Sequence, residues 1–589
     1  MCGIAGVMMR HGRPPDLRIL DHLAAALAHR GPDSHRCHIS GAVGLVHTRL
    51  AIIDLETGDQ PFYDVQGNVL IANGEIYNDP ELRNQLRDVD FATRSDCEVA
   101  LHLYRRKGSS FVDSLRGMYA IALYDRATDR LLLCRDPFGI KPLYYVETAE
   151  YFAFASEPQA LLGAGLAGRR LRRSACAELM QLKFTTGADT IFSDIRRLLP
   201  GETLIVAGAT IVERRRRGAL HDGPTSAANY QDALQRLDDV LHDSVEHHLR
   251  ADVPYGLFLS GGIDSSALAG LMAHLTEQPL VALTAAFPGS AAADELPYAQ
   301  RVARSVAADH HVVEMTASSF SEIAPRVAAA LDDPTTDAAT LPTYALADAV
   351  RGQLKVVLTG EGGDEIFCGY SRYYRARRFG RLFARPARSR GEFDRLGRVD
   401  GFLNGWRDGL DRAEGQERRG ARTFIQKLQA VDCAEWLPND LLLKVDRCLM
   451  THGVEGRTPF LDPVVADFAF CLPDRLKATS RMAKRLLRDW LAIRVPAAEP
   501  YARKTGFNPP VGEWIAAHQP SLGILVGCQP GVREIFRQEY VSRAFADLKK
   551  HHQAAWSLLF YALWHSHHVL QLPSDGTILE VLDQAHALG

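Results

Sequence analysis

The sequence predicts an α/β protein built from two unlike parts, and three observations lead to this prediction. The chain has 589 residues, 46% of them apolar and 24% charged, which is a globular composition in a chain too long for one hydrophobic core. Its first part, about 200 residues, carries short β-type runs between turns, which predicts stacked antiparallel sheets with flanking helices. Its later part alternates apolar strands with helical segments and then becomes mostly helical, which predicts a parallel α/β sheet with a helical C-terminal part.

The N-terminal strands are expected where apolar, β-branched and aromatic residues run together. Helical periods occur at 16–29 and 96–107, and those helices should flank the sheets. Together these elements define a first domain over residues 2–205. The expected strands are 43–55, 68–78, 118–125, 130–136 and 151–157.

A polar segment at 206–230 is expected to be a linker or an exposed edge, because four consecutive arginines there stand among glycine, proline and small polar residues. Beyond it, a second domain over 231–589 should open with an amphipathic helix. Its strands are expected at 255–260, 279–287 and 354–360. A further arginine-rich stretch, 372–399, is interpreted as a solvated helical surface, with contact to an anionic partner as the alternative.

Bulk properties exclude several classes of protein. A net charge of −3 gives no reason to expect nucleic acid or an anionic membrane as partner. No apolar run approaches the ~20 residues of a membrane-spanning helix, and no signal peptide is recognised. The ten cysteines form neither a CxxC pair nor a Cys/His cluster, so we expect no zinc site, no disulfide framework and a cytoplasmic location.

Cys2 stands apart from the other cysteines because it becomes the first residue if the initiator Met is removed. Its α-amine could then act as general base for its own thiol, so no catalytic histidine would be needed. The alternative is that Cys2 is a small apolar residue at the start of a strand. Position alone does not decide between these two interpretations.

Polar groups downstream favour the catalytic interpretation. Arg49 could bind an α-carboxylate, and Glu75 and Asp96 could bind an α-ammonium. The amide of Asn73 with the N–H of Gly74 could stabilise an oxyanion. These groups suit recognition of a small zwitterion beside Cys2.

The ordered motifs MCGIAGV, HRGPD, RLAIID, NGEIYN, SD and RDPFGIKPLYY resemble the glutaminase domain of class II (N-terminal nucleophile) glutamine amidotransferases, over about residues 2–200. The resemblance implies an αββα sandwich of the Ntn-hydrolase type with Cys2 as nucleophile. It implies an oxyanion hole at Asn73 and Gly74. It also implies glutamine binding by Arg49, Ile52, Ile53, Glu75 and Asp96.

A second motif, SGGIDSS at 260–266, follows an apolar strand and opens an amphipathic helix. Its glycines let backbone N–H groups close on an anion, its serines add donors, and the helix N-terminus adds a positive partial charge. The string matches the pyrophosphate loop of ATP pyrophosphatases, which implies cleavage at the α-phosphate to AMP and pyrophosphate. Asp264 could then hold Mg²⁺ for the departing pyrophosphate.

A third cluster, TGEGGDE at 359–365, follows another strand, and the carboxyl ends of parallel strands share one crevice. With LLLKVDR, EGRTPFLD, KRLLR and RKTGFNPPVGEW it resembles the synthetase domain of the asparagine synthetase B family over about 235–515. The resemblance implies an adenine nucleotide alpha hydrolase-like domain in which Asp264 and Asp364 hold Mg²⁺. It implies Glu361 at the reacting centre and Lys484 on the adenylate. The implied ATP-binding residues are Leu259, Ser260, Gly261, Gly262, Asp264, Ser265, Ser266, Ala285, Thr359 and Gly360.

The expected function is that of a glutamine-dependent asparagine synthetase, a carbon–nitrogen ligase. Glutamine, ATP and a carboxylate, aspartate first, are the expected small-molecule substrates. Ammonia from Cys2 would pass through an internal tunnel to a β-aspartyl-adenylate, giving asparagine, glutamate, AMP and pyrophosphate. The family suggests a homodimer, which composition does not decide.

Other interpretations stay open. EGRTPFLD replaces EVRVPFLD, EIFCGY replaces EIFGGY, and the aromatic pair expected after the PGE of 200–202 is missing, so a relative that amidates another carboxylate is the alternative. A regulatory protein with an inactive amidotransferase fold conflicts with the complete set of Cys2, Asp264, Asp364 and Lys484. A simple glutaminase would not need SGGIDSS, and a sugar-phosphate amidotransferase would carry an isomerase domain in its place.

Overall fold

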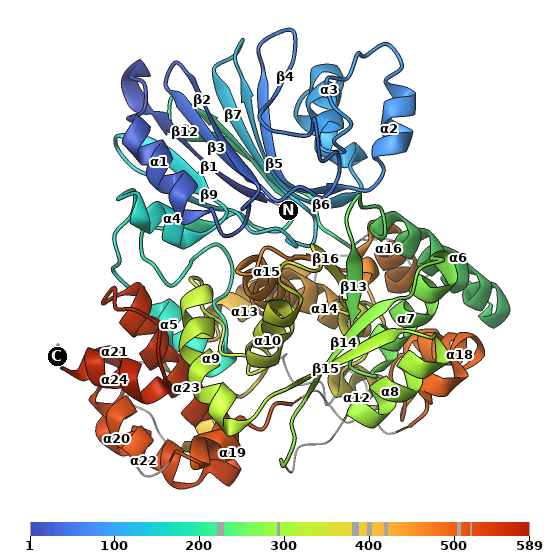
Figure 1. Cartoon of the computed structure of the whole chain (residues 1–589), viewed down its shortest axis with the longest axis vertical. Coiled ribbons are helices and arrows are strands. Elements are labelled where there is room, and N and C mark those ends of the chain that lie inside the picture. The colour runs from blue at the N-terminus through green and yellow to red at the C-terminus, as the bar shows by residue number, and fades with distance from the viewer. Residues whose placement is uncertain are drawn as a thin grey trace.

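The computed structural model describes residues 2–220, 229–290, 295–379, 388–396, 403–417, 422–502, 508–518 and 521–587. Figure 1 shows a blue and cyan sandwich of sheets packed against a larger part that holds a green parallel sheet among helices. The predicted fold class is confirmed. Among the described residues, no helix is both long and apolar enough to cross a lipid bilayer.

The N-terminal domain is an αββα sandwich of two antiparallel sheets, and apolar side chains from both sheets fill the space between them. One sheet has the order β10-β8-β9-β1-β3-β2 and is covered by α1 (Leu17–Ala26) and α4 (Pro158–Gly163). The other has the order β12-β11-β7-β6-β5-β4 and is covered by α2 (Asp79–Gln85) and α3 (Glu98–Lys107). The strands are β1 (Cys2–Met9), β2 (Ser34–Ser40), β3 (Val43–Arg49), β4 (Phe62–Tyr63), β5 (Val69–Ile76), β6 (Gly117–Asp125), β7 (Arg130–Arg135), β8 (Tyr144–Glu147), β9 (Tyr151–Ala155), β10 (Arg196–Arg197), β11 (Glu202–Ala207) and β12 (Thr210–Arg216).

The first half of the segment expected at 206–230 as a linker or exposed edge belongs to the second sheet, as the end of β11 and the edge strand β12. β12 pairs with β11 at the end of the second sheet, and its arginines point to solvent, as an edge strand that avoids further pairing requires. Residues 221–228 lie outside the described residues.

The C-terminal domain is built on a parallel sheet of order β15-β14-β13-β16-β17. Its strands are β13 (Tyr255–Phe258), β14 (Val281–Ala286), β15 (Asp309–Glu314), β16 (Val356–Leu358) and β17 (Glu455–Arg457). Figure 1 shows one group of helices on each side of this sheet. One group is α6 (Tyr230–His248), α7 (Ile263–Leu275), α8 (Leu296–Ser305), α16 (Pro463–Cys471) and α18 (Arg485–Arg494), and the other is α9 (Ala317–Ala330), α10 (Thr340–Val350) and α15 (Leu442–Met450).

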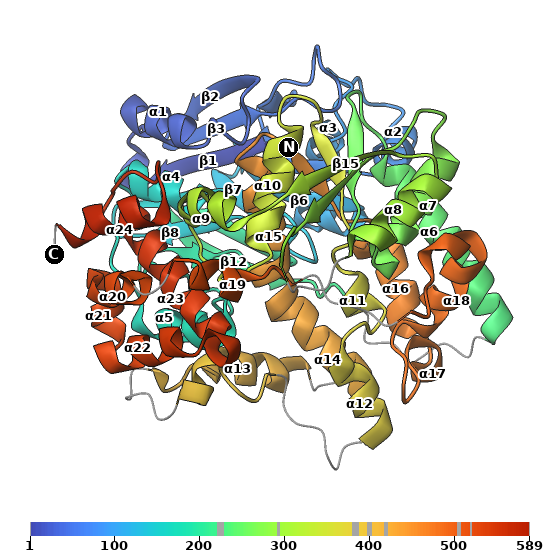
Figure 2. The ribbon, with the colours of Figure 1, turned by 60° about the horizontal axis from the view of Figure 1, so that its bottom comes forward.

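The helices beyond residue 500 form a layer that reaches back to the N-terminal domain, as Figure 2 shows around the cyan α5 (Arg173–Leu182). At its centre lies the apolar α23 (Leu548–His568), whose Trp556 and Trp564 indoles donate to the carbonyls of Thr336 and Leu331. Most side chains of its second half, from Ala554 onward, are buried.

The remaining α-helices of the C-terminal domain are α11 (Gly363–Ile366), α12 (Ser371–Phe379), α13 (Asp408–Glu417), α14 (Phe424–Val431), α17 (Asp474–Lys477), α19 (Val511–Ala516), α20 (Ser521–Cys528), α21 (Pro530–Ile535), α22 (Gln538–Ala546) and α24 (Ile578–His586).

A buried network of ion pairs joins the two domains. Arg30 of the N-terminal domain donates two hydrogen bonds to Asp446 on α15, at 2.8 and 3.0 Å, and one to Glu157 at 2.7 Å. Arg447, next on α15, lies 2.8 Å from Asp332 and 3.7 Å from Glu157. All five side chains are at most 3% exposed, so each charge depends on its partners rather than on water.

Replacing Arg447 by Met should destabilise the protein by about 3–5 kcal/mol, because Asp332 and Glu157 would keep buried charges without this partner. Arg170, whose side chain is 80% exposed and 3.8 Å from Asp194, is the matched control, and Arg170→Met should cost less than about 1 kcal/mol. The measurement is the urea midpoint of the two variants. Equal midpoints would contradict a structural role for the buried network.

Candidate active sites

Cys2 lies at the first position of β1, between β3 and the end of β5. Its backbone N–H donates to Asn73 Oδ1 over 3.1 Å, which fixes the start of the chain against β5. Burial raises the pKa of the thiol, and a hydrogen bond from the Leu50 backbone lowers it in part. A buried thiol of raised pKa needs a base at hand to react, and the adjacent chain terminus is the group expected to supply it.

Asn73 and Gly74 occupy neighbouring positions on β5. The Asn73 side chain is fully buried, and its Nδ2 makes no hydrogen bond with any part of the chain that the structure describes. A buried amide donor without a partner is costly unless a ligand uses it. Gly74 is required for packing as well, since a Cβ there would lie 2.2 Å from the carbonyl oxygen of Met118. The unpaired donor fits the expected oxyanion hole.

The residues expected to bind glutamine surround this point. Arg49 pairs with Cys2 across the sheet, and its guanidinium donates to Asp59 at 2.8 Å and to the carbonyls of Ile53 and Asp54. These contacts orient the guanidinium and leave it close to Cys2. Ile52 is buried in the apolar cluster beneath.

Glu75 and Asp96 are both buried carboxylates on the same side. Asp96 accepts a hydrogen bond of 2.6 Å from the Ile76 backbone. Burial raises the pKa of both groups, and their mutual repulsion raises that of Glu75 further. Such a pair favours a cationic partner, as an α-ammonium would be.

Arg457 is a residue of this site that the sequence did not identify. It belongs to β17 of the C-terminal domain, yet its Nη2 lies 3.3 Å from Glu75 Oε1. The EGRTPFLD motif was assigned to the synthetase domain by resemblance, and its arginine was given no role. Only the packing of one domain on the other brings it here.

The SGGIDSS segment forms the turn between β13 and α7, as expected. Gly261 has a φ of 73°, and a Cβ on it would lie 2.6 Å from the Ala299 backbone N, so only glycine fits. Ser260 and Ser265 hydrogen-bond each other at 3.1 Å, and α7 begins directly after Gly262. The helix N-terminus thus faces the cavity beside this turn.

A cavity of about 440 Å³ lies at the carboxyl ends of the parallel strands, where an open α/β sheet binds its ligand. Gly261 lines a smaller adjoining cavity, and Ser266 is buried inside α7 and faces neither. The predicted residues that line the larger cavity are Leu259, Ser260, Gly262, Asp264, Ser265, Ala285, Thr359, Gly360, Glu361 and Asp364.

Asp264, Asp364 and Lys484 converge at one edge of this cavity. Lys484 Nζ lies 2.5 Å from a carboxylate oxygen of each aspartate. Gly369 permits this approach, since a Cβ on it would lie 1.7 Å from Asp364 Oδ1 and 2.4 Å from Lys484 Cε. Two carboxylates aimed at one cationic centre are a fitting donor set for Mg²⁺, which usually takes one or two protein carboxylates together with substrate phosphates.

Lys444 and Asp337 are further cavity residues that the sequence did not identify. Lys444, on α15, lies 3.3 Å from Glu361 Oε1 and 3.4 Å from Asp337 Oδ2. The two carboxylates outweigh burial and raise the pKa of this lysine, so it stays charged. The LLLKVDR motif contained it, but only the fold shows that it points into the cavity beside Glu361.

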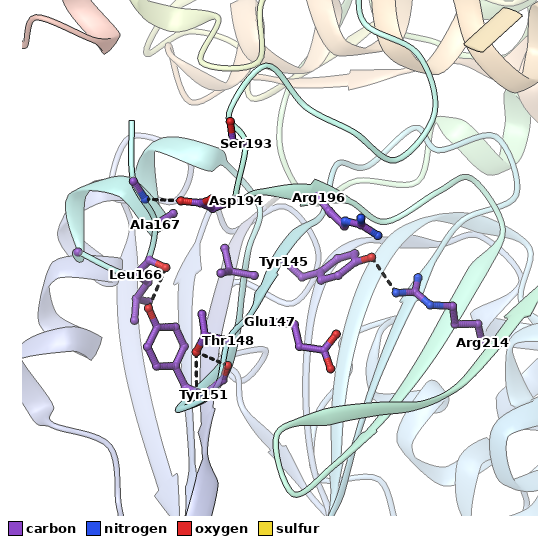
Figure 3. Close-up of a pocket in the computed structure, with 13 residues that line it drawn as sticks. Tyr145, Glu147, Thr148, Tyr151, Leu166, Ala167, Ser193, Asp194, Arg196 and Arg214 are labelled. Carbon is purple, nitrogen blue, oxygen red and sulfur yellow. Dashed lines mark hydrogen bonds between the residues drawn. The ribbon is translucent and has the colours of Figure 1, made fainter. Parts of the chain in front are cut away.

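A larger cavity, about 810 Å³, lies elsewhere on the N-terminal domain (Figure 3). Arg214 donates to the Tyr145 hydroxyl at 3.0 Å in it, with Glu147 and Arg196 nearby. None of the predicted site residues lines it, and its charged side chains are exposed surface groups. The volume of a cavity therefore does not identify the candidate active sites of this protein.

Comparisons with known proteins match the two parts of the chain to two different family models. The family model described as "Asparagine synthase" matches residues 236–566, and the one described as "Glutamine amidotransferase domain" matches 1–216, where β12 ends. "Asparagine synthetase [glutamine-hydrolyzing] 1" of Bacillus subtilis is 29% identical over 96% of this chain and 96% of its own. "Asparagine synthetase B [glutamine-hydrolyzing]" of Escherichia coli is 30% identical over 87% and 83%. "Amidase chyE" of Penicillium rubens is 33% identical over 63% and 60%.

Replacing Gly369 by Ala should disable the C-terminal site alone, because the added methyl displaces Asp364 and Lys484 from each other. A misplacement of about 1 Å can lower a rate about 100-fold, and a loss of this size is expected in ATP-dependent turnover. Glutamine hydrolysis should be unchanged. Gly163→Ala, where no atom lies within 4 Å of the new methyl, is the control. Full ATP-dependent turnover in Gly369→Ala would contradict this site.

Proposed function

The chain belongs to the asparagine synthase family, and from this premise we propose that it is a glutamine-dependent asparagine synthetase. The N-terminal domain releases ammonia from glutamine, and the C-terminal domain activates a carboxylate with ATP and transfers the ammonia to it. The observation that carries this proposal is the pairing of Cys2 and its unpaired Asn73 donor in one domain with the Lys484–Asp264–Asp364 centre in the other.

In the N-terminal site, Cys2 attacks the side-chain amide of glutamine. The Asn73 amide and the Gly74 N–H stabilise the oxyanion, which accounts for a buried donor otherwise left without a partner. Arg49 holds the α-carboxylate, with Ile52 and Ile53 beneath. Glu75 and Asp96 hold the α-ammonium. Ammonia leaves as the thioester of Cys2 forms, and water then hydrolyses the thioester to glutamate and free Cys2.

In the C-terminal site, the turn at 260–266 and the start of α7 bind the ATP phosphates, and Ala285 and Thr359 line the pocket. Mg²⁺ held by Asp264 and Asp364 would neutralise the pyrophosphate as it leaves. Lys484 stabilises negative charge on the acyl-adenylate and on the tetrahedral intermediate. Attack by ammonia on the adenylate releases AMP and the amide.

Ammonia must travel between the sites as neutral NH₃, because ammonium is not a nucleophile. One apolar cluster has members in both domains, and a passage along it would exclude water. Leu50, Ile52 and Met118 enter it from the N-terminal domain, and Leu441 and Leu257 enter it from the C-terminal domain. Leu441 also lines the cavity at the other end.

Aspartate is the acceptor that the cavity supports best. Lys444 can bind a carboxylate, and Glu361 and Asp337 beside it can bind an ammonium. The substitutions that depart from the family pattern, Cys368, Gly456 and Thr458, do not line the cavity. Neither do Thr203 and Leu204, which stand where the aromatic pair is missing. Amidation of a different carboxylate by the same adenylation remains the second candidate, since one relative is named an amidase.

Replacing Cys2 by Ala should abolish glutamine-dependent amide formation and leave ammonia-dependent formation within about twofold of normal, because the nucleophile serves only the first half-reaction. The measurement is AMP release with glutamine or with ammonium chloride as nitrogen source. Cys37→Ala, an exposed thiol in the same domain, is the control and should change neither rate. Glutamine use by Cys2→Ala would overturn the assignment of the nucleophile.

Supplied with glutamine, Mg²⁺-ATP and aspartate, the protein should release pyrophosphate, AMP and glutamate in step with asparagine. A panel of other carboxylates, each replacing aspartate, tests the acceptor. A higher kcat/KM for any of them would exclude aspartate as the preferred acceptor. Hydrolysis of ATP to ADP would exclude the adenylation chemistry altogether.

A further inference from the structure

Glu75 depends on the other domain for its counter-charge. Its side chain is buried, and its ion pair within the described chain is with Arg457 on β17. A buried carboxylate without a cation takes up a proton instead of staying charged. Arg457 of the synthetase half therefore favours the charged form of Glu75, the group expected to bind the α-ammonium of glutamine.

The Arg457 side chain is held in place by three other contacts. Its Nε lies 2.5 Å from Glu455 Oε1, and its Nη1 donates to the carbonyls of His248 and Arg250, at 2.7 Å each. Its Nη2 makes no hydrogen bond within the described chain and faces Glu75. Three fixed contacts leave one arm of the planar guanidinium aimed at the carboxylate.

The backbone of Arg457 reaches the second site. Its carbonyl accepts a hydrogen bond of 2.8 Å from the Thr359 N–H, and Thr359 lines the nucleotide cavity. β17 and β16 run parallel, with Arg457 opposite Leu358, so Arg457 is next to the start of the TGEGGDE turn. One residue thus contacts the glutamine site with its side chain and the nucleotide turn with its backbone.

We propose that Arg457 is a positioning residue for glutamine, which holds the Glu75 carboxylate in the orientation that receives the substrate α-ammonium. The proposal rests on the proposed function, since it takes glutamine as the substrate of Cys2. It makes the glutamine site complete only when the synthetase strand β17 is in place. Glutamine binding is thereby coupled to the domain that consumes the ammonia.

The charges around Glu75 give this role a distinct pH signature. Asp96 of the N-terminal domain and Glu455 of β17 raise the pKa of Glu75, after burial, while Arg457 and the chain terminus lower it. The thiols of Cys2 and Cys97 also lie near. Loss of the Arg457 charge moves the pKa of Glu75 upward, so protonation weakens glutamine binding at a higher pH than in the wild type.

The test compares Arg457→Met, Arg457→Lys and the wild-type full-length chain in glutamine hydrolysis across pH and in ammonia-dependent synthesis. Arg457→Met should raise the KM for glutamine about tenfold and shift the acid limb of kcat/KM upward by about one pH unit, with a smaller effect on kcat. Arg457→Lys should restore most of the pH profile. Ammonia-dependent synthesis should stay within about twofold of the wild type.

An unchanged KM for glutamine and an unchanged acid limb in Arg457→Met would overturn the proposal. A loss of ammonia-dependent synthesis as large as the loss of glutamine hydrolysis would also overturn it, because it would mark Arg457 as a purely structural residue. If Arg457→Met does not fold, Arg457→Lys serves in its place, because it lacks the fixed fork and should still raise the KM for glutamine. An unchanged KM there overturns the proposal too. A wild-type chain that hydrolyses no glutamine would instead overturn the proposed function.

Discussion

Buried charge at the interface between the domains is the constraint on which the rest of the structure depends. Arg30, Glu157, Asp446 and Arg447 come from both domains and are shielded from water. A buried ion pair adds little net stability over an apolar contact, but an orphaned buried charge costs several kcal/mol. The network therefore adds little to the free energy of assembly, but displacing one domain relative to the other would cost much more free energy. Arg30 Nε also lies 3.3 Å from the Cys2 carbonyl, so the same arginine that joins the domains holds the strand that begins at Cys2.

This constraint explains why two short elements carry residues for both sites. On α15, Lys444 faces the nucleotide cavity, whereas Asp446 faces Arg30 and the N-terminal domain. Residues two apart on a helix point in different directions, so one helix can serve two sites with no loop between them. β17 does the same through the side chain and the carbonyl of Arg457. A shift of either element would disturb both sites at once.

The sequence predicted the residues that act through local motifs and missed those that act through packing. Cys2 stands at a strand end, Asp264 and Asp364 stand in or beside glycine turns, and Asn73 precedes a glycine inside β5. In each case the local pattern already places a polar group beside backbone donors. Lys444 and Arg457 have no such local signal, since their partners are 83 and 382 residues away, at Glu361 and Glu75. β17 is three residues long, too short to show a strand period, and was not predicted. The strands β6 and β14 were predicted because burial on both faces makes them almost continuously apolar, and β5 begins with an apolar run at 69–72.

Burial also sets the protonation of the groups that ammonia could meet near the interface. Burial lowers the pKa of His47 on β3 to about 3, with the charge of Arg49 as the next cause. Burial likewise lowers the pKa of His248 on α6 well below its usual value, and its ring packs 4.0 Å from that of Tyr77, a member of the shared apolar cluster. Both imidazoles are therefore neutral near pH 7 and are too weakly acidic to protonate NH₃. Arg30 and Arg457 carry guanidinium groups, which do not release protons in this range. These two imidazoles and two guanidinium groups therefore do not trap ammonia as ammonium.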